Sequence, residues 1–188
     1  LTLGCQNKGS TVVDGTIDDV DSAEQTLQLS LSSHDTIAGD TIEYSLVWVD
    51  GDGAEEAVEA YTLGSDLEDP LASDGSTLTA TVAGGHTLTA TATATDGTDQ
   101  SAEQSLSVEP GEIVLVSVEL SADVVVAGEV VTYTVSAQDG YGNAAGTDDA
   151  EIAVDDSVTV DESSLISTLA GVHIITATIG ELQGEDAW

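Results

Sequence analysis

Apolar and polar residues alternate along most of this chain. Between residues 41 and 49, every second residue from Ile42 to Trp48 is apolar. Successive side chains of an extended strand point to opposite sides, so these apolar side chains share one face. Asp and Gly residues follow at 50–53, where they favour a tight turn. The pattern predicts a half-buried antiparallel strand that ends in a hairpin turn.

The same alternation recurs in both halves of the chain and predicts an all-β protein. Val, Ile, Leu, Ala and Thr supply most of the apolar surface, since the sequence has no Phe or Met, and β-branched residues suit pleated sheets. No convincing helix is predicted, and one short turn at 54–60 is the most helical structure that the pattern allows. The further predicted strands are 26–32, 76–82, 86–95 and 102–108 in the first half, and 112–120, 131–137, 151–154, 158–160, 164–168 and 172–179 in the second.

The sequence contains an internal repeat. Three segments of the first half return in the second half at almost constant spacing, which one duplicated domain explains. The matching pairs are 37–45 with 126–134 and 50–53 with 139–142, both at an offset of 89 residues, and 83–91 with 170–178 at an offset of 87 residues.

The repeat divides the chain into three parts. Residues 1–22 form an N-terminal arm outside the repeat, residues 23–109 form domain 1, and residues 112–188 form domain 2. The boundary falls at Pro110, which lacks a backbone donor, and Gly111, which permits a bend. Each unit approaches the roughly 100 residues of a typical β-sandwich. So short a linker predicts an extended, semi-rigid pair of domains.

The repeated segments resemble the bacterial immunoglobulin-like domains found in tandem in surface adhesins and invasin-type proteins. Residues 126–143 resemble the second strand and following turn of that family, and residues 170–178 resemble its penultimate strand. The resemblance covers 113–182 closely and 26–108 more loosely. It implies two tandem immunoglobulin-like antiparallel β-sandwiches after the N-terminal arm. It also implies a rod-building or adhesive module outside the cell, with no chemistry of its own.

The charge is extreme, with 36 acidic residues against a single Lys, no Arg and a net charge of −35. Nucleic acids and anionic lipids are bound through Lys and Arg, so both are excluded as partners. Dense negative charge destabilises a compact state unless cations screen it, which predicts a saline or calcium-rich setting. Solubility alone is the alternative explanation. Direct membrane insertion is not expected, because no stretch approaches the ~18 apolar residues that a span needs.

Acidic turns are candidate calcium sites. Asp50 and Asp52 lie two residues apart among glycines, and Asp155 and Asp156 form a second pair. Calcium needs six to eight oxygen ligands, which such turns help to gather. The first turn is not a complete EF-hand loop, because Tyr61 stands where the bidentate Glu would be. The alternative is that Asp and Gly form hairpin turns on a solvated surface. No cofactor is required, and calcium is the one that the sequence suggests.

No catalytic motif is present, so the chain is not expected to be an enzyme. His86 and His173 occupy equivalent positions in the two repeats, and a residue duplicated with its domain favours a structural role. The sequence has no nucleophile motif, Gly-rich phosphate loop or zinc-binding histidine pair.

The N-terminal arm is the candidate self-assembly element. Its apolar residues alternate in two short groups that belong to neither repeat, and an extended arm can add to the exposed edge of a neighbouring sheet. Such head-to-tail contacts generate filaments when they do not close, so a homopolymer is the leading prediction. The alternative is that the arm supplies the opening strand of its own domain 1. The arm residues in question are Leu1, Leu3, Cys5, Val13 and Ile17.

The same arm carries the predictions on export. Leu3-Gly4-Cys5 resembles the end of a bacterial lipoprotein signal, which would make Cys5 a lipidation site, and the alternative is an idle thiol. The sequence lacks an initiator Met, which a removed export signal explains. We therefore expect an extracellular or cell-surface protein that forms a filament or layer. The alternative function is a cell-surface adhesion module, with or without calcium, that binds a surface protein or a glycan.

Overall fold

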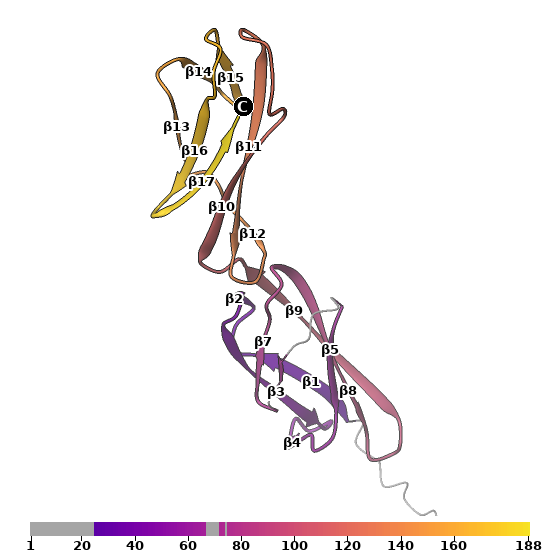
Figure 1. Ribbon diagram of the computed structural model, residues 1–188. Helices are drawn as coiled ribbons and strands as arrows, with labels where there is room; N and C mark the ends of the chain where they lie inside the picture. The colour runs from indigo at the N-terminus through magenta and orange to yellow at the C-terminus, as the bar shows by residue number, and fades with distance from the viewer. Residues whose placement is uncertain (1–24, 67–71, 74) are drawn as a thin grey trace, which may run out of the picture.

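The computed structural model describes residues 25–66, 72–73 and 75–188. All its regular elements are β-strands, so the all-β prediction is confirmed. Figure 1 shows two elongated lobes joined end to end, each built from two sheets. In the described part of the chain, no helix meets the length and apolarity that a membrane span requires.

The first lobe, domain 1, is a sandwich of two sheets with separate strand orders. One sheet has the order β1-β3-β7-β6, with β4 paired to β3, and the other has the order β2-β9-β8-β5. The strands are β1 (Thr26–Leu31), β2 (Asp35–Ile37), β3 (Thr41–Val49), β4 (Glu55–Ala57), β5 (Thr62–Ser65), β6 (Ala72–Ser73), β7 (Thr77–Thr79), β8 (Gly84–Thr93) and β9 (Asp99–Glu109).

The second lobe, domain 2, repeats this plan. One sheet has the order β10-β11-β15-β14, with β12 paired to β11, and the other has the order β13-β16-β17. The strands are β10 (Ile113–Leu120), β11 (Val130–Asp139), β12 (Ala144–Ala145), β13 (Glu151–Val154), β14 (Val158–Asp161), β15 (Ser164–Ser167), β16 (Ile174–Ile179) and β17 (Leu182–Ala187).

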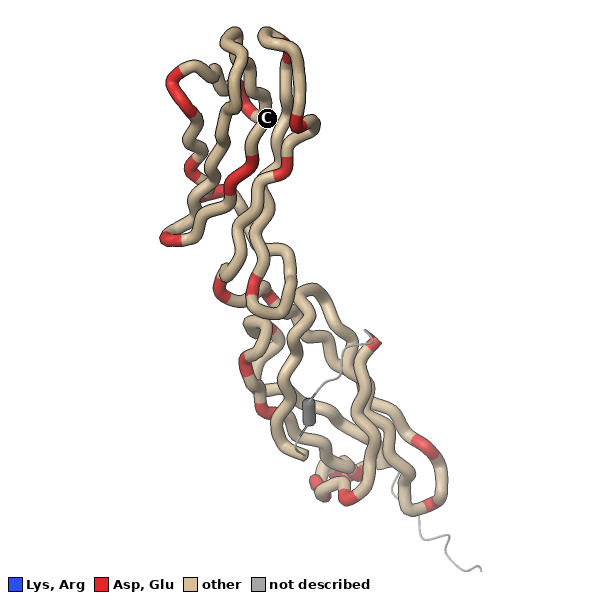
Figure 2. The backbone as a smooth tube through the Cα atoms, in the orientation of Figure 1, with Lys and Arg blue, Asp and Glu red and all other residues tan. Residues whose placement is uncertain are grey.

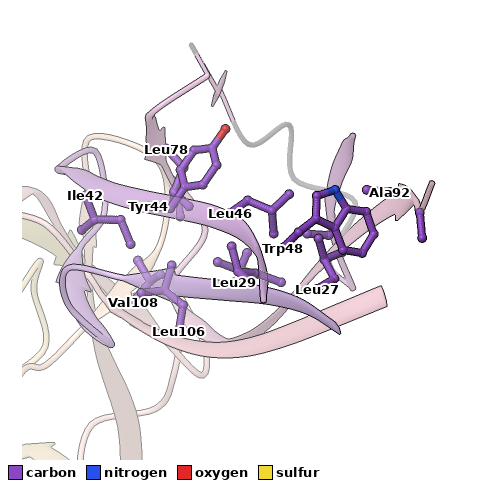
Figure 3. Close-up of a cluster of buried hydrophobic side chains, with 14 of the residues drawn as sticks. Leu27, Leu29, Ile42, Tyr44, Leu46, Trp48, Leu78, Ala92, Leu106 and Val108 are labelled. Carbon is purple, nitrogen blue, oxygen red and sulfur yellow. The ribbon is translucent and has the colours of Figure 1, made fainter. Parts of the chain in front are cut away.

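The core of each lobe comes from the alternating strands. On β3, the side chains from Ile42 to Trp48 on the predicted face are 6–8% exposed, as predicted (Figure 3). Full burial of one such aliphatic side chain stabilises a fold by about 1.5–3 kcal/mol. Domain 2 has its own core around Val131, Leu165 and Ile175, each 0% exposed. Each sandwich therefore has a separate apolar interior.

The predicted turn at 54–60 is wrong, because β4 pairs with the end of β3 instead. The sequence also gave no signal for β17, whose Gly and acidic residues have low strand propensity. This strand is held by backbone pairing along β16. A Cβ atom on Gly184 would come within 2.8 Å of the Ser117 Cα atom. Only glycine lets β17 approach β10 so closely.

Acidic residues cover both lobes, mostly in turns and at strand ends (Figure 2). The described residues contain no Lys or Arg that could pair with them. Apolar burial in each core must therefore overcome the mutual repulsion of the acidic surface residues.

Candidate functional site

The candidate site lies at the ends of the two lobes. We call the end of each domain that bears its Asp-Gly turn the proximal end, and the opposite end the distal end. The proximal end of domain 2 sits on the distal end of domain 1. The proximal turns are residues 50–54 and 139–143, and the distal loops are 37–39 with 81–83 in domain 1 and 126–128 with 168–170 in domain 2.

Both proximal turns are folded in the same way by an aspartate. Asp50 Oδ1 accepts hydrogen bonds from the backbone N–H groups of Asp52 at 3.0 Å and Ala54 at 2.8 Å. Asp139 Oδ1 accepts the equivalent bonds from Tyr141 and Asn143, both at 2.9 Å. The shared role of Asp50 and Asp139 is therefore to form the turn that follows a long strand.

Within the residues that the structure describes, the second turn is the one that bonds to another domain. The Asn143 side chain accepts a bond from the Ala83 N–H at 2.8 Å and donates one to the Thr81 carbonyl at 2.8 Å. These two bonds satisfy the backbone of the distal loop of domain 1 much as a neighbouring strand would. The first turn has Ala54 in the corresponding place and cannot make them.

Asp139 ties the turn to the linker. Its Oδ2 atom accepts bonds from the Gly111 N–H at 2.7 Å and from the Asn143 side chain at 2.8 Å. The residue is 3% exposed, and burial by itself raises the pKa of its carboxyl. The bonds from Asn143, Gly111 and Tyr141 outweigh this effect and lower the pKa to about 2. A charged, fully bonded carboxylate thus sits at the junction.

Tyr141 packs against Gly39 at the same junction. A Cβ atom on Gly39 would lie 2.6 Å from the Tyr141 Cε2 atom, so only glycine allows this contact. Gly39 also has a φ of 91°, in the left-handed region that favours glycine. The turn, the amide clamp and the tyrosine together fix how domain 2 sits on domain 1.

Two buried histidines support the distal loops. His86 Nε2 lies 2.7 Å from the Val82 carbonyl, and His173 Nε2 lies 2.9 Å from the Leu169 carbonyl. The two rings are 2% and 7% exposed. Each imidazole therefore fastens a distal loop through the carbonyl four residues before it, which is a structural role shared by both repeats.

His173 also forms an ion pair. Its Nδ1 atom lies 2.8 Å from Asp155 Oδ2. The bond to the Leu169 carbonyl and the bond to Asp155 raise the pKa of His173 above its usual value. Bonds from Ser157 and from His173 lower the pKa of the Asp155 carboxyl. The folded state thus favours the charged form of both side chains.

The predicted calcium residues do not form a shared cage. Among the residues that the structure describes, no three His, Cys, Asp or Glu side chains come together as a metal-binding group. Asp50 and Asp155 instead support the turns and the imidazole named above, while Asp52 and Asp156 are exposed. The calcium site stays a prediction of the sequence.

The predicted self-assembly residues, and Cys5 as a lipidation site, lie outside the described residues. Sequence reasoning missed Asn143, Tyr141 and Asp139 as junction residues. The available signal was the difference between the two repeated turns, where Tyr141 and Asn143 replace Asp52 and Ala54. The arm residues predicted for self-assembly are Leu1, Leu3, Cys5, Val13 and Ile17, and their role stays a prediction.

Comparison with known proteins supports the fold. No family model and no curated protein sequence matches the chain. The structure of FdeC, described as a broadly conserved Escherichia coli adhesin, is similar over 89% of this chain and 63% of its own, at 15% identity and a TM-score of 0.52. Mouse cadherin-23 EC22-24 is similar over 87% of this chain and 63% of its own, at 14% identity and a TM-score of 0.49.

A surface-layer protein, SbsC, is similar over 86% of this chain and 27% of its own, at 17% identity and a TM-score of 0.40. This chain spans less than two thirds of the FdeC structure. The likeness to FdeC shows the fold alone, an immunoglobulin-like β-sandwich.

We predict that Gly39→Ala loosens the junction. The new methyl group displaces the Tyr141 ring, so domain 2 gains freedom relative to domain 1. Gly128→Ala is the matched control, because Gly128 has the same φ of 91° but an added Cβ would have no neighbour within 4 Å. Small-angle X-ray scattering should show a broader distribution of interdomain distances for Gly39→Ala alone. Equal profiles for the two variants would contradict a role for the Tyr141 contact.

We predict that domain 2 loses stability as pH rises above neutrality. The pKa of His173 is raised, so its contribution is complete below the ordinary histidine pKa of roughly 6.5 and is lost as pH rises through the folded value. The pKa of Asp155 is lowered, so its contribution disappears only at acidic pH. Thermal unfolding followed by the fluorescence of the two tryptophans, of which Trp188 belongs to domain 2, should show a lower Tm for domain 2 at pH 9 than at pH 6.

The Trp188 ring lies 5.4 Å from the His173 ring, so it reports on this site directly. His173→Gln should flatten the pH dependence, and Asp155→Asn should reduce it. An unchanged slope in His173→Gln would show that other groups cause it.

We predict that calcium raises the Tm of the chain beyond the effect of ionic strength alone. The measurement compares millimolar CaCl₂ with NaCl at matched ionic strength. The double variant Asp50→Asn and Asp52→Asn should remove the excess shift if the first turn holds the ion. Asn keeps an acceptor oxygen for the turn bonds, which makes the comparison specific to charge. Equal shifts in the two salts would leave only screening.

Proposed function

We infer that this chain is an extracellular, non-enzymatic structural protein whose copies assemble end to end, through the N-terminal arm, into a filament or surface layer. The observation that carries the proposal is the junction between the two domains. There, the proximal end of one sandwich is clamped onto the distal end of another by Asn143, Asp139 and Tyr141. The chain is thus already a short rod of end-to-end units (Figure 1).

The two end surfaces of this pair of domains are different. Domain 1 presents its proximal end and domain 2 presents its distal end, so a contact between copies joins two different surfaces. Contacts of that kind produce open polymers unless a rotation closes them into a ring. An arm that precedes domain 1 is suited to such a contact, because an added strand gains main-chain bonds whatever its side chains are.

A possible Ser-His-Asp grouping in domain 2 does not suit catalysis. Ser157 Oγ and Asp155 Oδ2 both approach the same histidine atom, His173 Nδ1, at 3.3 Å and 2.8 Å. A nucleophilic serine needs the other ring nitrogen as its base, with the carboxylate on the opposite side. Here that nitrogen is bonded to the Leu169 carbonyl. The serine hydroxyl donates instead to the Asp155 carboxylate, whose lowered pKa makes it a weak base, so the grouping supports the non-enzymatic proposal.

The charge supports an extracellular, cation-screened setting. With a net charge of −35, copies repel each other strongly at low ionic strength. At ~1 M salt, the Debye length of about 3 Å reduces this repulsion to near-contact distances. The negative exterior then keeps a polymer hydrated without preventing its growth.

We predict that the purified chain forms regular filaments or sheets in ~1 M NaCl with a reducing agent present. Deletion of residues 1–22 should leave monomers, because the proposed assembly element is gone. Negative-stain electron microscopy and light scattering measure both proteins side by side. Circular dichroism controls for folding, since the core residues that the structure describes lie outside the deleted segment. Monomers of the complete chain at every salt concentration would contradict the proposal and favour an adhesion module for a surface protein or glycan.

A further inference from the structure

The chain enters domain 1 at its proximal end and leaves it at its distal end. β1 begins beside the proximal turn, where Thr26 pairs with Val49. β9 ends at the distal loop, where the Glu109 carbonyl accepts a bond from the Ala38 N–H at 2.8 Å. Figure 1 shows β9 running up to the junction with domain 2. Tension along the chain therefore pulls β1 and β9 in opposite directions.

The two strands that receive this tension lie in different sheets. β1 pairs with β3 in one sheet, and β9 pairs with β8 in the other. A side-chain bond joins them directly, from Gln104 Nε2 to the Leu29 carbonyl at 3.0 Å. A backbone connection is provided by β2, which follows β1 along the chain and pairs with the last residues of β9. Force that crosses domain 1 is therefore carried by the pairing of β2 with β9, together with the apolar core between the sheets.

β2 and β9 run in parallel, and this orientation decides how their bonds are loaded. Residues 35–37 pair with residues 107–109. The Ser107 N–H donates to the His34 carbonyl at 2.8 Å, and His34 Nδ1 lies 2.9 Å from the Ser105 carbonyl. Tension draws β2 back toward its first residue and β9 forward past its last residue. The bonds between the strands lie across this direction, so they are sheared together and share the load.

The same movement would also disturb the core. Val108 lies in the middle of the paired segment, is 3% exposed and belongs to the core of domain 1. Because successive side chains of a strand point to opposite faces, a slip of β9 by one residue would turn its polar neighbours toward the core. Glu109 and Ser107 are both exposed and polar. The strands therefore cannot slide past each other gradually, and the pairing must break before β9 moves.

We propose that the pairing of β2 with β9 is a tension lock, a short set of backbone bonds that keeps domain 1 folded when the chain is pulled from both ends. The lock is built from strands of a single chain, so it does not rest on the proposed assembly. Forced unfolding follows the height of the unfolding barrier and not the equilibrium stability. A paired segment of three residues can therefore contribute more under tension than it contributes to the free energy of unfolding.

The test compares two directions of pulling on the same domain of the complete chain. Pairs of cysteines in a Cys5→Ser background carry DNA handles for optical tweezers. Gln25→Cys with Glu112→Cys loads β2 and β9 from opposite ends, which is the shear geometry. Asp40→Cys with Glu112→Cys loads both strands from the distal end, which is the peel geometry. Asp40 and Glu112 are exposed, and domain 2 lies outside the loaded segment in both proteins.

The expected rupture force is at least about twofold higher in the shear geometry, because several bonds share the load there and the peeled bonds break one after another. Thermal unfolding followed by circular dichroism is the control, and the two cysteine pairs should give the same Tm. Equal rupture forces in the two geometries would overturn the proposal.

A pair of proline variants locates the resistance within β9. Ser107→Pro removes the N–H that donates to the His34 carbonyl, and Ser105→Pro is the matched control. Both serines are exposed, and alternation directs their N–H groups to the same side of β9, where the pairing with β2 begins at Ser107.

At constant force in the shear geometry, Ser107→Pro should speed unfolding about fivefold, the factor expected for the loss of one net hydrogen bond. Ser105→Pro should leave the unfolding rate unchanged. An equal effect of the two variants would place the resistance elsewhere in the domain and overturn the assignment to this pairing. The comparison of pulling directions tests the lock without either proline.

Discussion

The structure depends on one carboxylate at the end of the longest strand of domain 2. Asp139 folds its own turn through Oδ1 and holds the linker and Asn143 through Oδ2. Burial of a charge is costly, and bonds from Gly111, Tyr141 and Asn143 offset that cost while they fix the turn and the linker relative to each other. The turn thereby fixes the position of domain 2 relative to domain 1. Without this carboxylate, the junction would lose its bonds to the Gly111 N–H and to the Asn143 side chain.

The equivalent carboxylate in domain 1 shows why such a role cannot be derived from one turn alone. Asp50 and Asp139 end equivalent strands and make the same two turn bonds. Their sequences therefore predict the same local structure, and the structure confirms it. What differs is the surface opposite each turn, which depends on how the domains are joined. The contrast between Ala54 and Asn143 was visible in the sequence, but its meaning required knowledge of the contact partner.

Some strands are likewise determined by their own sequence, and others by contacts with distant segments. β3 and β13 have the predicted bounds, because alternation is a property of neighbouring residues. β2 and β17 were missed, since a three-residue strand and a Gly-containing acidic strand are formed by their pairing partners. Asp155 was expected to be a calcium ligand, and the structure places it against His173, which lies on a different segment. Contacts between distant segments decide both the irregular strands and the use of each carboxylate.

Charge repulsion and strand pairing act over different distances, and for this reason the proposed assembly depends on salt. Repulsion between chains of net charge −35 reaches about 30 Å at 0.01 M salt and about 3 Å at 1 M. Main-chain hydrogen bonds act only at contact and barely depend on salt. In the proposed assembly, the long-range repulsion keeps copies apart at low ionic strength before an arm can reach a neighbouring sheet. In concentrated salt the short-range bonds remain, so the proposal makes growth of the rod depend on ionic strength.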